Sequence, residues 1–460
     1  MVEKRELKDS ILFDEGDSNL TSSRQKWHDE ELDAETRKWL KKDETVFLHQ
    51  SLSTPCLDLM ETCEGSYITD HMGNRFLDFH GNSVHQVGFA NPEVITAIKA
   101  QLDELSFCTR RFTNKTSISL AEKLVNLASP SLNKVLFAPG GTTAVGIAIK
   151  LARLVTGRFK TLSMWDSFHG ASLDALSVGG EAFFREGIGP LLPGSEHVPP
   201  PDPYRCLWRE DSDCSQCDLK CAKYIEYVLD KERDVAALIA EPIRCTKINP
   251  PPEGFWDHVR DVCNRHGTLL IFDETAVCLG KTGEMFACQT YNVEPDILTI
   301  GKGLGGGILP LAAVLSKEDM DVASHTALGH YTHEKNPVLC AAGLATLDYI
   351  ESENLLDRVK KLEPCIAEKL NRLKQRHALV GDVRGQGLIF GAELVTDRIE
   401  KKPAIEAADQ VMYECLKRGL SFKTSQGNFI TLTPPLTVTN QELDDAFEIL
   451  DRSLAAVSSS

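Results

Sequence analysis

Thr268-Leu-Leu-Ile-Phe-Asp-Glu274 is the stretch of this sequence that decides the fold, together with Asp296-Ile-Leu-Thr-Ile-Gly-Lys-Gly303. In each, an apolar run of strand length leads into a charged residue, Asp273 in the first and Lys302 in the second. Open α/β sheets build their sites where parallel strands end. We therefore expect both charged side chains at one edge of a buried sheet.

A lysine and a carboxylate delivered in this way suit pyridoxal phosphate (PLP). This cofactor needs a lysine for its Schiff base and an acid that keeps its ring nitrogen protonated. Taken alone, Lys302 in Gly-Lys-Gly-Leu-Gly-Gly-Gly could be a surface lysine in a flexible loop. The pairing with Asp273 favours the cofactor, so we predict that Lys302 and Asp273 are catalytic and also contact PLP.

Length, charge and cysteine content limit the possible functions. A chain of 460 residues is long enough for two or three domains. Its net charge of −17 argues against a nucleic-acid or anionic-membrane partner, because phosphate binding requires a basic surface. We find no secretory signal and no apolar run of membrane-spanning length. With 14 cysteines in such a chain, we expect reduced thiols and a cytoplasmic location.

The apolar patterns predict an α/β protein with two domains and an N-terminal arm. Residues 1–45 are polar and form the predicted arm, and residues 46–95 resemble short strands of a smaller domain. From 96 to 345, strand-like runs alternate with helical patterns, which indicates a large domain with a mostly parallel sheet covered by helices on both faces. Residues 346–460 are predicted to complete the smaller α+β domain.

A cradle for the cofactor phosphate is predicted after the strand-like run at 135–137. There Pro-Gly-Gly-Thr-Thr leads into a helix that we expect to begin near Ala144. Backbone N–H groups at a helix start suit a phosphate, and here Gly141 supplies an N–H group and Thr142 a hydroxyl. A plain β-turn explains the same residues about as well.

A second loop, Phe168-His169-Gly170, follows the strand-like run at 161–164. Phe168 could stack on the cofactor ring, and His169 could lie beside it. An aromatic residue at such a position is more often part of a core, so the two interpretations stay open.

Together these residues give the chain a family resemblance. It resembles the class III, or ω-, branch of PLP-dependent aminotransferases, which have fold type I, from Gly65 to about Leu454. The motifs that carry the resemblance are Ile239-Ala-Glu-Pro-Ile243, Leu270-Ile-Phe-Asp-Glu274, Gly280-Lys-Thr-Gly283, Pro295 to Gly307, and Thr332 to Ala342.

This resemblance has consequences for the fold and the site. It implies a seven-stranded, mostly parallel sheet in the large domain and a small domain formed by both chain ends. It also implies a homodimer with active sites at the subunit interface, in which Thr332 reaches the cofactor phosphate of the neighbouring subunit. Glu241 would lie in the wall near the cofactor, although a structural acid at a strand end is nearly as plausible.

The chain departs from the family at the substrate gate. The family often pairs a glutamate with an arginine so that two substrates can bind in turn, and here these positions are Thr246 and Thr431. Loss of one charge alone would leave the other buried and unpaired, at a cost of about 3–5 kcal/mol. Replacement of both residues by threonine avoids this cost. An enzyme that completes its chemistry on one substrate needs no gate. In addition, Thr275-Ala276 replaces the usual Val-Gln, whose glutamine touches the ring hydroxyl.

Three arginines could bind an anionic substrate. Arg110 and Arg111 lie in the segment that enters the family's substrate pocket, and Arg244 stands where the family usually has glutamine. Arginines clamp dianions through bidentate hydrogen bonds. Each could also be a surface ion-pair residue, but we predict all three as substrate-binding residues.

These departures are similar to those of aminotransferase-like lyases that act on hydroxylated aminoethylphosphonates. That resemblance implies a PLP-dependent ammonia-lyase that turns a small anionic amine into phosphonoacetaldehyde and ammonia. The alternative is an ω-aminotransferase that passes the amino group to a keto acid. A cofactor-binding protein without turnover is disfavoured by the intact Lys302 and Asp273.

One cysteine cluster has no place in this site. Cys206, Cys214, Cys217 and Cys221 form C-x7-C-x2-C-x3-C in a polar insertion. Four clustered thiols can bind zinc, but the spacing is irregular and C-x2-C occurs once. The sequence favours free thiols, and we assign no metal ligand from it.

Overall fold

The computed structural model describes residues 21–51, 53–208, 214 and 217–458. The chain forms two compact units. The first contains the chain up to Gly81, Thr246–Ile248 and Lys361–Ser460, and the second contains Asn82–Cys245 and Asn249–Lys360. The domain boundaries proposed from the sequence, after residues 95 and 345, stay a prediction.

The second unit is built on a seven-stranded sheet in the order β4-β10-β9-β8-β7-β5-β6. The strands are β4 (Leu132–Ala138), β5 (Lys160–Met164), β6 (Ser195–Val198), β7 (Val235–Ala240), β8 (Leu269–Asp273), β9 (Ile297–Ile300) and β10 (Ala312–Lys317). All neighbours from β9 to β6 are parallel, whereas β10 runs antiparallel to both β4 and β9. This confirms the predicted mostly parallel sheet.

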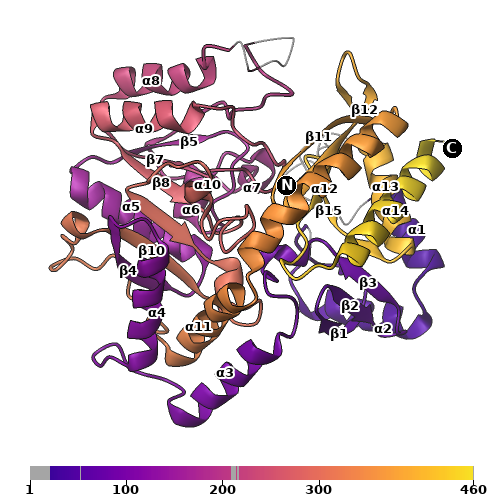
Figure 1. Ribbon diagram of the computed structural model, residues 1–460, viewed down its shortest axis with the longest axis horizontal. Coiled ribbons are helices and arrows are strands. Elements are labelled where there is room, and N and C mark those ends of the chain that lie inside the picture. The colour runs from indigo at the N-terminus through magenta and orange to yellow at the C-terminus, as the bar shows by residue number, and fades with distance from the viewer. Residues whose placement is uncertain (1–20, 52, 209–213, 215–216, 459–460) are drawn as a thin grey trace. The chain divides into compact units, whose positions relative to one another are not determined.

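Helices cover this sheet on both faces, which explains its apolar strands. Every residue of β7 is buried, as expected of a strand enclosed on two sides. The helices of this unit are α3 (Pro92–Glu104), α4 (Lys115–Leu127), α5 (Gly141–Thr156), α6 (Leu173–Val178), α7 (Ala182–Arg185), α8 (Lys220–Glu232), α9 (Phe255–His266), α10 (Ala287–Thr290) and α11 (Pro337–Ser352). Helix α5 packs across the central strands, and α9 packs against β8 (Figure 1).

Helix α5 begins at Gly141, and the expected start near Ala144 was wrong. Gly140 has an extended backbone with φ 178°, so it ends the preceding segment and serves as the N-cap. The Thr143 hydroxyl donates to the Gly140 carbonyl at 2.6 Å. The first helical turn therefore contains the glycine and both threonines of the predicted cradle.

The first unit joins both ends of the chain. Its first sheet contains β1 (Met60–Glu64), β2 (Tyr67–Asp70), β3 (Arg75–Asp78) and β14 (Leu420–Ser421). Its second contains β11 (Val380–Gln386), β12 (Ile389–Asp397), β16 (Phe429–Leu432) and β15 (Lys423–Ser425), with β13 (Lys402–Pro403) beside β12. Strand β14 pairs with β3 in parallel, which confirms a small α+β domain formed from both chain ends.

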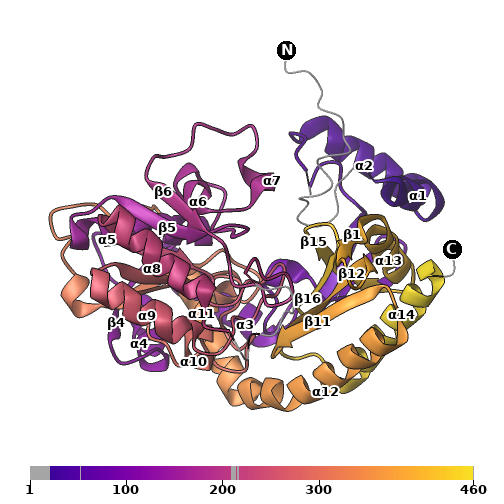
Figure 2. The same ribbon diagram turned by 90° about the horizontal axis from the view of Figure 1, so that it is seen from above.

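Helices α12 (Leu355–Arg376), α13 (Ile405–Lys417) and α14 (Asn440–Ser458) complete this unit. Helix α13 packs against β12, β15 and β16, and α12 lies beside β11 (Figure 2). The described part of the N-terminal arm is helical, with α1 (Ser22–Glu30) and α2 (Ala34–Val46). The buried Trp27 anchors it by ring contacts to Phe76 and Tyr413 at centroid distances of 6.4 and 6.3 Å. No helix in the described chain is long and apolar enough to cross a membrane.

Candidate active site

Two neighbouring parallel strands deliver the two charged residues that the sequence analysis singled out. Asp273 is the last residue of β8, and Lys302 follows the end of β9 by two residues. In the register of the two strands, Asp273 lies opposite Thr299. The strands are held together past this point by a hydrogen bond from the Glu274 N–H group to the Thr299 carbonyl at 2.9 Å. Both residues are therefore delivered at the carboxyl edge of one sheet.

The Asp273 carboxylate is buried and held by hydrogen bonds from three residues. The Nδ1 atom of His169 lies 2.7 Å from Oδ2. Oδ1 accepts the Thr275 N–H group at 3.1 Å, the Thr275 hydroxyl at 2.8 Å and the Thr299 hydroxyl at 3.1 Å. Burial alone would raise the pKa of Asp273, but the bonds from His169 and Thr275 outweigh it and hold this pKa below its usual value. The carboxylate is therefore ionised at neutral pH.

Lys302 has an unusual backbone conformation and an exposed side chain. Its φ is +46°, in the left-handed region, which costs a non-glycine residue about 1 kcal/mol or more. Gly303 packs so closely on the buried Gln86 that a Cβ atom would lie 1.8 Å from Gln86 Oε1. Gln86 is itself fixed by a hydrogen bond from Nε2 to the Ser83 carbonyl at 3.1 Å. The close packing of Gly303 on Gln86 thus helps to hold the strained backbone of Lys302.

The predicted phosphate cradle is formed by the first turn of α5 and a neighbouring loop. No side chain caps the start of α5, so its N–H groups at Gly141 and Thr142 have no side-chain partner at the N-cap. The Thr142 hydroxyl lies 2.6 Å from the Ser172 hydroxyl and accepts the Ser172 N–H group at 3.1 Å. Gly170, with φ +132°, approaches Thr142 so closely that a Cβ atom would lie 2.4 Å from its hydroxyl oxygen.

Thr275 links these parts, and the sequence analysis had noted it only as a departure. Its methyl carbon lies 3.2 Å from where a Gly141 Cβ would be and 3.5 Å from where a Gly301 Cβ would be. One side chain therefore touches the start of α5 and the end of β9 while its hydroxyl donates to Asp273. The one feature of the sequence that could have indicated this role is the position of Thr275 shortly after Asp273, the acid at the end of the strand.

Phe168 and Glu241 lie together beside this edge of the sheet. The Phe168 N–H group donates to Glu241 Oε1 at 3.2 Å, and the Cys245 N–H group donates to Oε2 at 3.3 Å. The Phe168 ring packs on Phe184 with centroids 4.3 Å apart. In this structure Glu241 therefore orders two backbone segments, and its contact with a cofactor stays a prediction.

The three arginines have different surroundings. Arg110 and Arg111 are exposed, and an Nη2 atom of Arg110 contacts His330 Nε2. Arg244 is buried and forms an ion pair with the buried Glu181. Its charge is thus compensated by a residue that the sequence analysis did not single out, because 63 residues separate the two.

Thr246 and Thr431, at the expected gate positions, meet directly. The Thr431 hydroxyl donates to the Thr246 carbonyl at 2.5 Å and lies 2.9 Å from the Ser425 hydroxyl. Thr431 is buried. The two gate positions that the family resemblance implies are thus joined by a neutral hydrogen bond to a backbone carbonyl. Thr332 lies in an exposed turn, and its predicted contact with a neighbouring subunit stays a prediction.

The model of the class III aminotransferase family matches residues 50–454. This chain belongs to that family. It is 47% identical to the (R)-1-hydroxy-2-aminoethylphosphonate ammonia-lyase of Vibrio splendidus, over 98% of this chain and 97% of the relative. It is 36% identical to the leucine/methionine racemase of Thermococcus litoralis, over 83% and 87% of the two chains.

Solved structures of aminotransferases have the same fold. The PLP-bound amine transaminase from an uncultivated Pseudomonas species superposes with a TM-score of 0.83 at 33% identity, over 89% of this chain and 98% of that one. An aminotransferase of Bacillus anthracis gives a TM-score of 0.84 at 30% identity, over 92% and 100%. The fold is therefore fold type I, and PLP is the cofactor.

The residues present fit PLP. Oδ2 of the buried Asp273 accepts one hydrogen bond, from His169, and a carboxylate oxygen can accept a second from a protonated ring nitrogen. The N–H groups at the start of α5 suit the phosphate, and the Lys302 amine supplies the covalent link. We infer that these three features hold the cofactor.

We expect Lys302→Ala to abolish the covalent link between PLP and the chain and to lower turnover by about 10²–10⁴-fold, since the base is lost. Lys150→Ala, on the exposed face of α5, is the matched control. Borohydride reduction followed by mass spectrometry of the intact chain provides the measurement. The wild type and the control should gain the cofactor's mass, and Lys302→Ala should not. A mass gain in Lys302→Ala would contradict the assignment.

We predict that the stability of the folded protein depends on pH through Glu274, the residue next to Asp273. Burial raises its pKa from 4.5 to about 7, despite hydrogen bonds from the Cys288 and Ala287 N–H groups, and the charge of Asp273 adds to the rise. Because the folded pKa exceeds the unfolded one, stability from this group is full below about pH 4.5 and is lost as pH rises through about 7. Glu274→Gln should flatten the fall in melting temperature over this range.

Glu284→Gln is the control for this measurement, because Glu284 is an exposed acid paired with Lys360. Its melting temperature should follow the wild-type pH profile. Identical profiles for the wild type and Glu274→Gln would show that the Glu274 carboxyl does not titrate as predicted.

Proposed function

We propose that this protein is a PLP-dependent ammonia-lyase that converts (R)-1-hydroxy-2-aminoethylphosphonate into phosphonoacetaldehyde and ammonia, a step of phosphonate breakdown. The observation that carries the proposal is the 47% identity, over 98% of the chain, to the Vibrio splendidus enzyme of that activity. An ω-aminotransferase is the alternative, because transaminases of the same fold are also similar to this chain.

The neutral gate supports a reaction with a single substrate. A transaminase must bind an amine and then a keto acid in one site, and a switchable ion pair serves that exchange. Here Thr431 and Thr246 are joined by an uncharged hydrogen bond. A neutral contact of this kind has no charge to neutralise or release when substrates change. These two positions therefore provide no electrostatic switch for the alternation of substrates.

Each catalytic residue has a task that follows from its surroundings. Bound PLP withdraws electrons from the carbon next to the substrate nitrogen. The Lys302 Nζ atom is the proposed general base that takes the proton from that carbon. The ionised Asp273, held by His169 and Thr275, supports a protonated ring nitrogen. Loss of the neighbouring hydroxyl and uptake of one water then balance the reaction, which yields one aldehyde and one ammonia.

The phosphonate dianion requires positive charge, and the exposed Arg110 and Arg111 are the proposed source. Arg244 contributes less in this arrangement, because Glu181 already compensates its charge. It would bind substrate only if that ion pair opened. We therefore rank the three arginines by exposure and place Arg110 and Arg111 first.

We further propose a homodimer in which each subunit completes the other's site. The exposed turn with Thr332 lies in the same unit as a group of exposed apolar side chains. These are Leu102, Leu105, Phe107, Phe112 and Ile308, of which Phe112 is 70% exposed. Four of them, Leu102, Leu105, Phe107 and Phe112, lie in one short stretch of the chain, and apolar side chains gathered on a surface favour an interface. A cytoplasmic location is also proposed, since all of the cysteines are free thiols in this structure.

The test of the proposed function is catalysis without a keto acid. With the hydroxylated aminophosphonate in large molar excess, the purified enzyme should release ammonia and phosphonoacetaldehyde continuously and in equal amounts. 2-Aminoethylphosphonate, which lacks the leaving hydroxyl, is the matched control and should release no ammonia. A single stoichiometric conversion of the cofactor to its pyridoxamine form, followed by arrest, would instead identify a transaminase.

Arg110→Ala and Arg111→Ala should each lower kcat/KM by about 10–100-fold, since a charge-assisted hydrogen bond to the phosphonate is lost. Arg372→Ala is the control, because Arg372 lies on the exposed face of α12. Steady-state kinetics on the phosphonate substrate provides the measurement. Unchanged kcat/KM in both variants would remove these arginines from the substrate site.

A further inference from the structure

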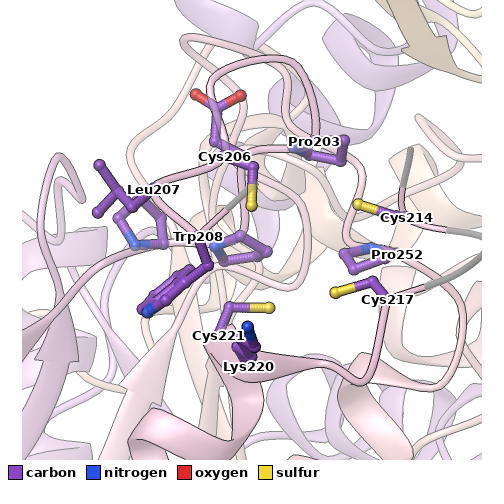
Figure 3. Close-up of a pocket in the computed structure, with 12 residues that line it drawn as sticks. Pro203, Cys206, Leu207, Trp208, Cys214, Cys217, Lys220, Cys221 and Pro252 are labelled. Atoms are coloured by element: carbon purple, nitrogen blue, oxygen red, sulfur yellow. The ribbon is translucent and has the colours of Figure 1, made fainter. Parts of the chain in front are cut away.

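Four cysteines that play no part in the active site converge on one small cavity. Cys206, Cys214, Cys217 and Cys221 line it together with prolines, Leu207 and Trp208, and all four sulfur atoms point inward (Figure 3). The cavity measures about 20 Å³, which is room for one ion or one water molecule. Cys221 is buried and the other three are partly buried. The four thiols thus share one apolar, ion-sized space.

The segment that carries these cysteines has little regular secondary structure in its described residues. Strand β6 ends at Val198 and helix α8 begins at Lys220, and in its described residues the structure shows no α-helix or strand between them. Connections of this length without secondary structure are uncommon in compact domains. Their backbone must be fixed by side chains, by a disulfide or by a metal. The cysteines here are free thiols rather than disulfides.

We propose that this cluster is a structural zinc site, with Cys206, Cys214, Cys217 and Cys221 as its ligands. Four sulfur ligands select a thiophilic ion and match the closed tetrahedral coordination of structural Zn²⁺. Four protein ligands leave no open position, so the site has no catalytic role. Clustered cysteines in a reduced, disulfide-free protein are more readily explained by metal binding than by cross-links.

The electrostatic surroundings support this assignment. Cys221 is the second residue of α8, whose N-terminus has no side-chain cap. The positive end of this helix and the adjacent Lys220 offset the net negative charge of a zinc tetrathiolate.

Ion binding requires the cluster to contract. Within the described parts of the chain, no three histidine, cysteine, aspartate or glutamate side chains are already held at metal-ligand spacing. The sulfurs must close around the ion by side-chain rotation. Such closure would fix the connection between β6 and α8. Pro200 and Pro201 of this connection also line a neighbouring hollow with Glu241 and Arg244, so the zinc would brace the wall behind these residues.

Metal analysis of the purified full-length holoenzyme tests the proposal. Protein prepared with Zn²⁺ and a thiol reductant, and then passed through gel filtration, should contain about one zinc per chain. Cys217→Ser and Cys221→Ser should each lose most of it. Cys365→Ser, which removes an exposed cysteine elsewhere, should retain it. Zinc-free wild-type protein, or equal zinc in all variants, would overturn the proposal.

A second measurement on wild-type protein covers the case in which the serine variants do not fold. Titration with a mercurial reagent should release zinc in step with modification of four thiols, as followed by a zinc indicator. Replacement of zinc by Co²⁺ should give the visible absorption of tetrahedral cobalt thiolate, at wavelengths beyond the cofactor's band. Zinc release without thiol modification, or a cobalt spectrum without tetrahedral bands, would contradict cysteine ligation.

Discussion

The buried carboxylate of Asp273 is the interaction on which the rest of the site depends. An uncompensated charge in a protein interior costs several kcal/mol, so donors must surround it in the folded state. They come from the loop after β5, from the end of β8 and from β9, through His169, Thr275 and Thr299. The need to satisfy this one carboxylate brings three strand ends together. The Thr275 methyl group also packs against Gly141, at the start of α5.

The relatives to which this chain is similar include a transaminase, a racemase and an ammonia-lyase, so overall similarity alone does not fix the reaction. Two contacts of this chain bear on the charges around Asp273 and Lys302. The gate positions carry a neutral hydrogen bond between Thr431 and Thr246, whereas Arg244 and Glu181 form a buried ion pair.

The sequence allowed the strands with continuous apolar runs to be predicted, because such runs are typical of a sheet buried on both faces. It also placed Asp273 and Lys302 at strand ends. Strands β6 and β10 were not singled out, and the order of the strands in the sheet was not predicted, because an apolar pattern does not say which strands are neighbours. Nor could the sequence pair Arg244 with Glu181, because that contact joins residues 63 positions apart and depends on the finished fold. Local chemistry was predictable, and long-range pairing was not.

The fate of the substrate nitrogen tests the central claim most directly. Turnover of ¹⁵N-labelled (R)-1-hydroxy-2-aminoethylphosphonate with unlabelled pyruvate present separates the two reactions by where the label goes. If the neutral gate marks an enzyme that finishes its chemistry on one substrate, all of the label appears in ammonia and none in alanine. Labelled alanine formed in proportion to the aldehyde would contradict this, and would show that the chain transfers its amino group.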